Sequence, residues 1–307
     1  MDDTGNRAGE RRDEHLVKDY LVRATGLNGR VRMFAARSTE LVEEMRRRHD
    51  LYPTAAAALG RTATAAAMMG SMLKGKEKVT VQVKGNGPIG TIVADANAVG
   101  EVRGYVDDPH VHLPSNALGK LDVAGAVGRE GSIYIIKDLG LKEPYRGSIP
   151  IISGELAEDF TYYFAKSEQT PSAVSLGVLV ETDNSIKNAG GFILQLLPGL
   201  SDEDIDMLEQ KLASIPSVTS MLESGLTPED MLKELVGDLS SVETMDLRFQ
   251  CFCCRERVEN TLVSLGKDEL DAILEEDGRA EVVCHFCNEK YDFNREELVE
   301  IRDRLNA

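Results

Sequence analysis

Hydrophobic and polar residues alternate along several short segments, which predicts β-strands separated by turns. In Val79–Lys84 the order Val-Thr-Val-Gln-Val-Lys places every second residue on an apolar face, as in a half-buried strand. Asn28-Gly29 divides Tyr20–Arg37 into two strands, because this dipeptide favours a tight hairpin turn. The other predicted strands are Ile89–Asp95, Glu101–Val106, Ser132–Lys137, Gly147–Ile152, Val174–Glu181 and Phe192–Leu197.

Helical segments interrupt these strands. Ser38 is placed to cap a helix over Thr39–His49, whose last turn is rich in arginine and suits the negative end of the helix dipole. The alanine- and methionine-rich segment Ala55–Lys74 predicts a second helix that can pack closely on a sheet, and Glu155–Lys166 predicts a third. Because strands often follow one another without a helix between them, we expect residues 19–199 to form an α+β domain with a mixed sheet and packed helices.

Residues 200–248 have a different pattern. Ser201–Leu212, Ser217–Ser224 and Thr227–Val236 predict three short acidic helices that are separated by Gly and Pro. Isolated helices of this length are marginal in water, so they must dock on another surface to persist. We therefore expect a metastable helical linker, docked either on the C-terminal segment or on an apolar face of the preceding domain.

All the cysteines lie near the C-terminus, at Cys251, Cys253, Cys254, Cys284 and Cys287. Two cysteine pairs separated by a short folded insert are typical of a tetrathiolate zinc site. Residues 249–307 are too few to be stabilised by burial alone, so we expect one zinc ion to hold a small C-terminal domain together. The spacing does not decide which two thiols of the first cluster bind the metal, because Cys254 is an alternative to Cys253. His285 is a weaker ligand candidate than the thiols.

Composition and charge exclude some classes of binding partner. The 307 residues carry a net charge of −17, and the segment from Cys251 onward is itself acidic, with 8 Lys/Arg and 15 Asp/Glu, a net of −7. This charge disfavours binding to nucleic acid. No apolar run reaches the roughly 18 residues of a membrane span, so no membrane partner is expected. Residues 1–18 are predicted to be a disordered polar extension and not a secretory signal. The clustered free thiols indicate a reducing compartment, the cytoplasm.

The sequence contains no common enzyme motif in a context that would form an active site. Gly85, Gly87 and Gly90 match G-x-G-x-x-G, but a strand-like sequence follows instead of a helix, so we interpret them as a turn between two strands. His110 and His112 are predicted on one face of a strand, with a surface or loop role and no catalytic companion. Neither G-x-S-x-G, H-E-x-x-H nor a Walker loop occurs. We therefore expect a protein that is not an enzyme.

The cysteine segment resembles the redox-switch domain of the 33-kDa heat-shock chaperones. Its sequence is CFCCRERVENTLVSLGKDELDAILEEDGRAEVVCHFCNEKYDF, and the resemblance extends upstream through GNGPIGTIVADANAVGEVRGYV, SGELAEDFTYYFAKSEQTPS and GGFILQLLPG. It implies that Cys251, Cys253, Cys284 and Cys287 hold one zinc ion in a reduced, inactive state. It also implies that oxidation forms a disulfide within each pair, releases zinc and unfolds the switch and the linker.

The function implied by this resemblance is that of a redox-regulated holdase. Such a protein works without ATP, forms a homodimer when oxidised, and protects thermally unfolding or oxidatively damaged proteins from irreversible aggregation. The family commonly has a small residue where this chain has Cys254, so a Cys251–Cys254 disulfide is also available. The alternatives are a structural zinc-ribbon interaction module without redox switching, and a thiol-disulfide oxidoreductase, which the acidic non-thioredoxin setting disfavours.

Overall fold

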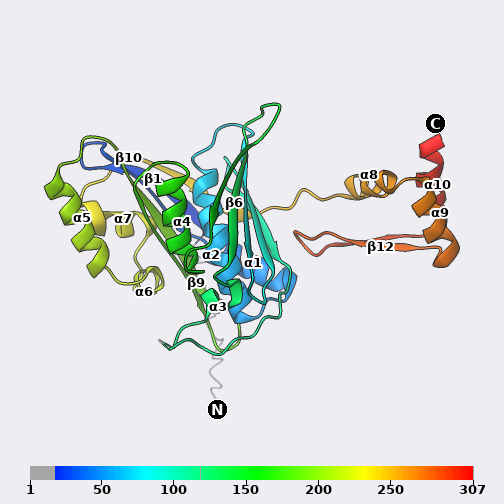
Figure 1. Ribbon diagram of the computed structural model, residues 1–307, viewed down its shortest axis with the longest axis horizontal. Helices are drawn as coiled ribbons and strands as arrows, with labels where there is room; N and C mark the ends of the chain where they lie inside the picture. The colour runs from blue at the N-terminus through cyan, green and yellow to red at the C-terminus, as the bar shows by residue number, and fades with distance from the viewer. Residues whose placement is uncertain (1–17, 118, 307) are drawn as a thin grey trace, which may run out of the picture.

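The computed structural model describes residues 18–117 and 119–306, and its strands form two large sheets and a hairpin (Figure 1). The five-stranded sheet has the order β10-β1-β2-β9-β8, and the six-stranded sheet has the order β11-β5-β4-β3-β6-β7. The strands are β1 (Tyr20–Gly26), β2 (Val31–Arg37), β3 (Lys78–Gly85), β4 (Thr91–Asn97), β5 (Glu101–Val106), β6 (Gly131–Asp138), β7 (Tyr145–Pro150), β8 (Ser172–Val180), β9 (Ile186–Leu196), β10 (Ser240–Asp246), β11 (Arg248–Phe249), β12 (Ala280–Val283) and β13 (Lys290–Phe293).

Helices cover both sheets, so the predicted α+β fold class is confirmed. Most predicted elements are present with shifted ends; β9, for example, begins at Ile186 rather than at Phe192. The helices are α1 (Thr39–His49), α2 (Pro53–Gly70), α3 (Val123–Val127), α4 (Leu156–Lys166), α5 (Asp202–Ser214), α6 (Val218–Glu223), α7 (Pro228–Val236), α8 (Arg255–Leu265), α9 (Lys267–Glu276) and α10 (Arg295–Asp303). The extension expected at residues 1–18 lies outside the described residues except for Lys18.

Helix α2 organises the main core between the two sheets. It contacts β3, β4 and β5 of the six-stranded sheet and β8 and β9 of the five-stranded sheet. Its alanines and methionines are almost completely buried. The small alanine side chains let the helix approach strands on both sides, and the flexible methionine side chains fill the remaining space. Leu59 and Met68 of α2 lie in the same apolar cluster as Val81 and Ile193 from the two sheets.

The glycine motif forms a turn between β3 and β4, as expected from its sequence. The backbone N–H of Gly87 donates to the carbonyl of Val127 in α3 at 2.9 Å. A Cβ atom on Gly87 would lie 2.2 Å from the carbonyl oxygen of Ala126. Glycine is therefore required here by the close approach of α3, and the motif does not begin a phosphate-binding helix.

The acidic helices α5, α6 and α7 belong to the face of the five-stranded sheet that points away from α2. Their buried residues, including Leu208, Met221 and Leu232, form one apolar cluster with Met33 and Phe192 of the sheet. Figure 1 shows these helices on the left, at the opposite side of the core from the C-terminal module. Of the two docking surfaces that the sequence left open, the apolar face of the preceding domain is therefore the one used.

The last predicted helix of the linker ends at Val236, as expected, and two strands that were not predicted follow it. β10 pairs antiparallel with β1 at the edge of the five-stranded sheet, and β11 pairs parallel with β5 at the edge of the six-stranded sheet. Apart from Met245, which is half-buried, the side chains of β10 are exposed. The strand is stabilised mainly by backbone pairing with an existing edge, a contribution that local sequence does not reveal.

The last part of the chain is a small module with its own core. Val258, Leu262, Leu270, Leu274, Phe293, Leu298 and Ile301 form an apolar cluster separate from the two clusters of the core. The strands β12 and β13 make an antiparallel hairpin. In Figure 1 the turn of this hairpin points toward the core, α9 and α10 lie at the far end of the module, and α8 lies between them and the core.

Candidate metal and redox centre

Four of the cysteines lie in two segments that meet at the core-facing end of the module. Cys251 and Cys253 follow β11 directly, and Cys284 and Cys287 lie in the turn between β12 and β13. That turn is tight: the Cys284 N–H donates to the carbonyl of Glu289 at 2.9 Å, and the N–H of Asn288 donates to the carbonyl of Cys284 at 2.8 Å. The hairpin thus holds Cys284 and Cys287 close together, and the end of β11 positions Cys251 and Cys253 beside them.

The four sulfur atoms lie within 4.8 Å of one another. The Sγ atoms of Cys253 and Cys287 are 3.2 Å apart, and those of Cys251 and Cys284 are 3.7 Å apart. A tetrahedral zinc ion with Zn–S bonds of about 2.3 Å requires sulfur atoms about 3.8 Å from each other. The donor set and its spacing therefore fit a tetrathiolate metal site, and all five cysteines are free thiols.

The surroundings of the thiols shift their pKa values in opposite directions. Burial acts to raise the pKa of Cys251, but the backbone N–H of Cys253 and the neighbouring thiols outweigh it and lower the pKa to about 7. Burial raises the pKa of Cys287 strongly and that of Cys253 more weakly, since the hydroxyl of Tyr291 donates to the Cys253 Sγ at 3.2 Å. Cys251 is thus the most acidic of these three thiols.

The remaining candidate ligands lie outside the cluster. Cys254 is exposed and occupies the N-cap position of α8. The ring of His285 is 5.7 Å from the ring of Tyr105, so it packs against the core. His110 and His112 lie in a loop, which agrees with the expected surface or loop role and corrects only their placement on a strand. His110 pairs with Asp50 at 3.1 Å. Among the residues described, the group of four that could hold a metal ion therefore consists of thiols.

Core side chains that no sequence motif marks as functional also contact this centre. Nη1 of Arg103 lies 3.9 Å from the Sγ of Cys251, and its guanidinium carbon lies 3.8 Å from the ring centroid of Phe286. His49 Nε2 is 3.1 Å from the carbonyl oxygen of Phe286. These residues come from β5 and α1, far from the cysteines in sequence, and no spacing motif connects them.

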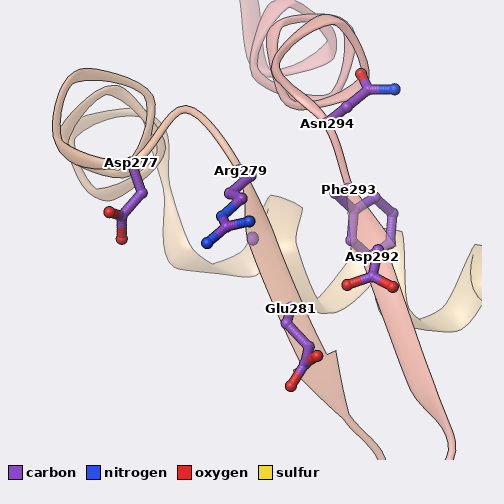
Figure 2. A pocket seen from close by; sticks show the side chains of 7 residues that line it. Asp277, Arg279, Glu281, Asp292, Phe293 and Asn294 are labelled. Atoms are coloured by element: carbon purple, nitrogen blue, oxygen red, sulfur yellow. The ribbon is translucent and has the colours of Figure 1, made fainter.

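Two hollows in or beside the module differ in their chemistry. One, of about 330 Å³, is lined by Cys251, Cys253 and Cys287 together with core and module residues, so small molecules can approach the thiols. The other, of about 590 Å³, lies between β12, β13 and the end of α9. Figure 2 shows Arg279 surrounded there by carboxylates and Phe293, and no thiol lines it. The chemistry of the module is therefore concentrated at its core-facing end.

Comparison with known proteins shows a relationship over almost the whole chain. Residues 19–294 match the family described as Hsp33 protein. The chain belongs to the Hsp33 family. Among Hsp33 relatives, a 33 kDa chaperonin of Geobacillus sp. (strain WCH70) is 54% identical over 95% of this chain and 99% of its own length. The 33 kDa chaperonin of Bacillus subtilis (strain 168) is 54% identical over 93% of this chain and 99% of its own length.

A solved Hsp33 structure has the same fold. The crystal structure of the 33 kDa chaperonin, a heat shock protein 33 homolog, from Thermotoga maritima superposes with a TM-score of 0.89. It is 42% identical and covers 94% of this chain and 100% of its own. Membership of the Hsp33 family identifies the protein as a chaperone and not an enzyme. No helix in the described part of the chain has the length and apolar character needed to span a membrane.

Proposed function

We propose that the protein is a redox-regulated, ATP-independent holdase that is inactive when reduced and active when oxidised. The observation that carries this proposal is the convergence of four thiols, within 4.8 Å of one another, at the end of the module that faces the core. We assign Cys251, Cys253, Cys284 and Cys287 as both the metal ligands and the redox-active thiols. Bound zinc would keep them as thiolates and stabilise the module by about 10–16 kcal/mol.

Oxidation by peroxide then dismantles the centre. Two thiolates become a disulfide by losing two electrons, so two disulfides consume two molecules of hydrogen peroxide and four protons and yield four molecules of water. We propose that one disulfide forms in each cysteine pair. A disulfide sulfur is a poor zinc ligand, so zinc leaves and the module loses its main source of stability.

The helices α5, α6 and α7 are proposed as the cover of the client-binding surface. They bury an apolar face of the five-stranded sheet that includes Val22, Met33 and Phe192. The chain that follows α7 crosses the core as β10 and β11 and reaches Cys251 two residues after Phe249. Unfolding of the module frees the end of this segment, so the edge strands and then the short helices lose support. The uncovered face would hold unfolding proteins through apolar contacts.

The free thiols also indicate the cellular compartment in which the protein would work. We propose a cytoplasmic protein with core, linker and switch at residues 19–199, 200–248 and 249–307, because free clustered thiols require a reducing compartment. Its proposed partners are thermally unfolded or oxidatively damaged proteins and, after oxidation, a second copy of the chain. The acidic charge of −17 gives no support to nucleic acid as a partner.

Suppression of aggregation, measured together with zinc release, tests the proposal. A heat-aggregating reporter enzyme is warmed with reduced, zinc-loaded protein or with protein treated with peroxide, and a chromogenic chelator reports free zinc. We expect suppression only after oxidation, accompanied by release of one zinc ion per chain. Equal behaviour before and after peroxide, with zinc retained, would instead favour a structural zinc-ribbon interaction module without redox switching.

A further inference from the structure

Arg103 is held in a fixed position on the outer face of the six-stranded sheet. Its Nε and Nη2 donate to Oδ2 of Asp95, the residue opposite it on β4, at 3.0 and 2.8 Å. The other oxygen of Asp95 accepts a hydrogen bond from the hydroxyl of Thr80 on β3 at 2.6 Å. Three neighbouring strands thus orient one guanidinium group, and this leaves its Nη1 and one planar face directed toward the module.

That guanidinium contacts both cysteine segments. Nη1 lies 3.9 Å from the Sγ of Cys251, which belongs to the first pair. The guanidinium carbon lies 3.8 Å from the ring centroid of Phe286, which stands between Cys284 and Cys287 of the second pair. A cation over an aromatic face at this distance is a favourable contact, and it strengthens when water is excluded. A single core side chain therefore bridges the two cysteine segments, which α8, α9 and β12 separate in the sequence.

The residues around Arg103 hold Phe286 from other directions. Tyr105, two residues further along β5 and on the same face, meets the Phe286 ring edge to face at 5.2 Å between centroids. His49, at the end of α1, lies 3.1 Å from the Phe286 carbonyl oxygen, and Nδ2 of Asn288 donates to the carbonyl of Arg48 at 3.0 Å. The turn that bears Cys284 and Cys287 is thus seated on the core by its side chain and its backbone.

We propose that Arg103 is a positioning residue of the thiol centre and that its contacts with Cys251 and Phe286 slow the loss of metal. The four ligands come from two chain segments, so holding those segments together in advance reduces the entropy cost of assembling the site. The core domain then helps to set the rate at which the C-terminal module loses its metal. This inference rests on the proposed metal-binding function of the four cysteines.

The test is the rate of metal transfer from the reduced, zinc-loaded full-length protein to a chromogenic chelator in excess. We expect Arg103→Gln to release zinc about tenfold faster than the wild type, which corresponds to about 1.4 kcal/mol. Arg103→Lys keeps the charge but cannot stack on Phe286 while pairing with Asp95, so it should restore little of the difference. Lys84→Gln is the matched control, because it removes an exposed positive charge from β3 of the same sheet and should release zinc at the wild-type rate.

A second variant separates positioning from general destabilisation. Phe286→Leu leaves the core sequence unchanged and removes the ring that Arg103 and Tyr105 contact, so it should also accelerate release. Because the two changes remove one shared contact, the double variant should release zinc more slowly than the product of the two single effects predicts. Wild-type release rates in both single variants, or independent effects in the double variant, would overturn the proposal. If the wild type retained zinc under peroxide, the proposed redox function would fail, while these chelator rates would still decide the role of Arg103.

Discussion

Asp19 is a buried carboxylate at the start of β1, with only 2% of its surface exposed. Its Oδ2 accepts a hydrogen bond from the N–H of Leu41 at 2.8 Å, whereas its Oδ1 is 3.9 Å from Nε of Arg37. Burial raises the pKa of Asp19 to about 7, because these partners replace only part of the hydration that the charged form loses. At neutral pH this residue is therefore close to its titration midpoint in the folded protein.

Asp19→Asn should change how stability depends on pH. A carboxyl group with a higher pKa in the folded state binds a proton on folding, so its stabilising effect is present at low pH and is lost as the pH rises through about 7. Each unit of pKa difference corresponds to about 1.4 kcal/mol. We expect the free energy of unfolding to fall more between about pH 5 and about pH 8 in the wild type than in Asp19→Asn. Denaturant titrations of both proteins measure this, and parallel pH profiles would contradict it.

Cys254→Ser should leave the metal site intact. Cys254 is exposed at the start of α8 and is not a member of the group of four sulfur atoms. We expect the variant to bind one zinc ion per chain with wild-type affinity, whereas Cys253→Ser should weaken binding by orders of magnitude because a thiolate ligand is lost. Competition with a chelator of known affinity measures both. A matching loss of affinity in Cys254→Ser would mean that it serves as the fourth ligand.

The Cys284–Cys287 disulfide should form before a disulfide in the first pair. Residues two apart in an extended chain lie close to 7 Å from each other, beyond the usual separation of about 4.4–6.8 Å for bridged Cα atoms. Bridging Cys251 to Cys253 therefore requires a bend, whereas Cys284 and Cys287 already share a tight turn. Alkylation at early times after peroxide, followed by peptide mapping, gives the order. A Cys251–Cys253 or Cys251–Cys254 bridge appearing first would refute it.

The residues that make up the thiol cluster could be predicted from sequence, but their neighbours could not. The spacing of the cysteines predicts a metal site, since zinc requires several soft ligands close together, but it left Cys253 and Cys254 as alternatives, and only the family resemblance implied Cys253. Arg103, Tyr105 and His49 are ordinary residues of a strand and a helix, and only tertiary packing brings them to Phe286. The buried state of Asp19 likewise arises from β1, α1 and the Leu247 segment meeting at one point.

Among the elements, the short acidic helices depend most on their surroundings. Their caps and apolar positions predicted that they exist, and α5 and α7 each have a complete capping box. Their docking surface could not be predicted, because an amphipathic face shows only that a partner is needed. β10 was missed for the related reason that its exposed residues have no apolar alternation, and the open edge of β1 induces the strand.

Leu232→Ala should loosen α7 and make the reduced protein partly active. Leu232 is fully buried in the cluster that joins α7 to the five-stranded sheet. Truncating such a residue costs about 2–5 kcal/mol, which is large for the docking of a nine-residue helix. We expect faster amide exchange over residues 228–236 and measurable suppression of client aggregation without oxidant. Glu234→Ala, a change at an exposed position of the same helix, is the control and should do neither.

If Leu232→Ala accelerates exchange but gives no activity, the sheet face beneath α7 is not sufficient to bind clients. If neither exchange nor activity changes, α7 is held by contacts other than its apolar face. The two measurements thus distinguish undocking from client binding, which a single assay of aggregation would not do.

For the whole molecule, three separate apolar clusters define how its parts can unfold. The largest joins both sheets through α2, the second joins the linker helices to the five-stranded sheet, and the third is confined to the C-terminal module. The alternating strands and capped helices of the sequence predicted the α+β class, because these patterns are local. The seating of the module on the outer face of the six-stranded sheet depends on long-range contacts and could not be predicted.

Removal of zinc should therefore unfold the module and leave the main core folded. The core of the module has few buried residues, and its contribution cannot replace the roughly 10–16 kcal/mol that a structural zinc ion supplies. With chelator and reductant present, we expect amide protection to disappear over residues 255–303 and to persist in α2 and β3–β5. Hydrogen exchange with mass spectrometry gives both readings from one sample. The thiols stay reduced under these conditions, so the helices α5–α7 report on the effect of module unfolding alone. Loss of amide protection in these helices would show that unfolding of the module is enough to release the linker. Retained protection would show that the disulfides are required as well.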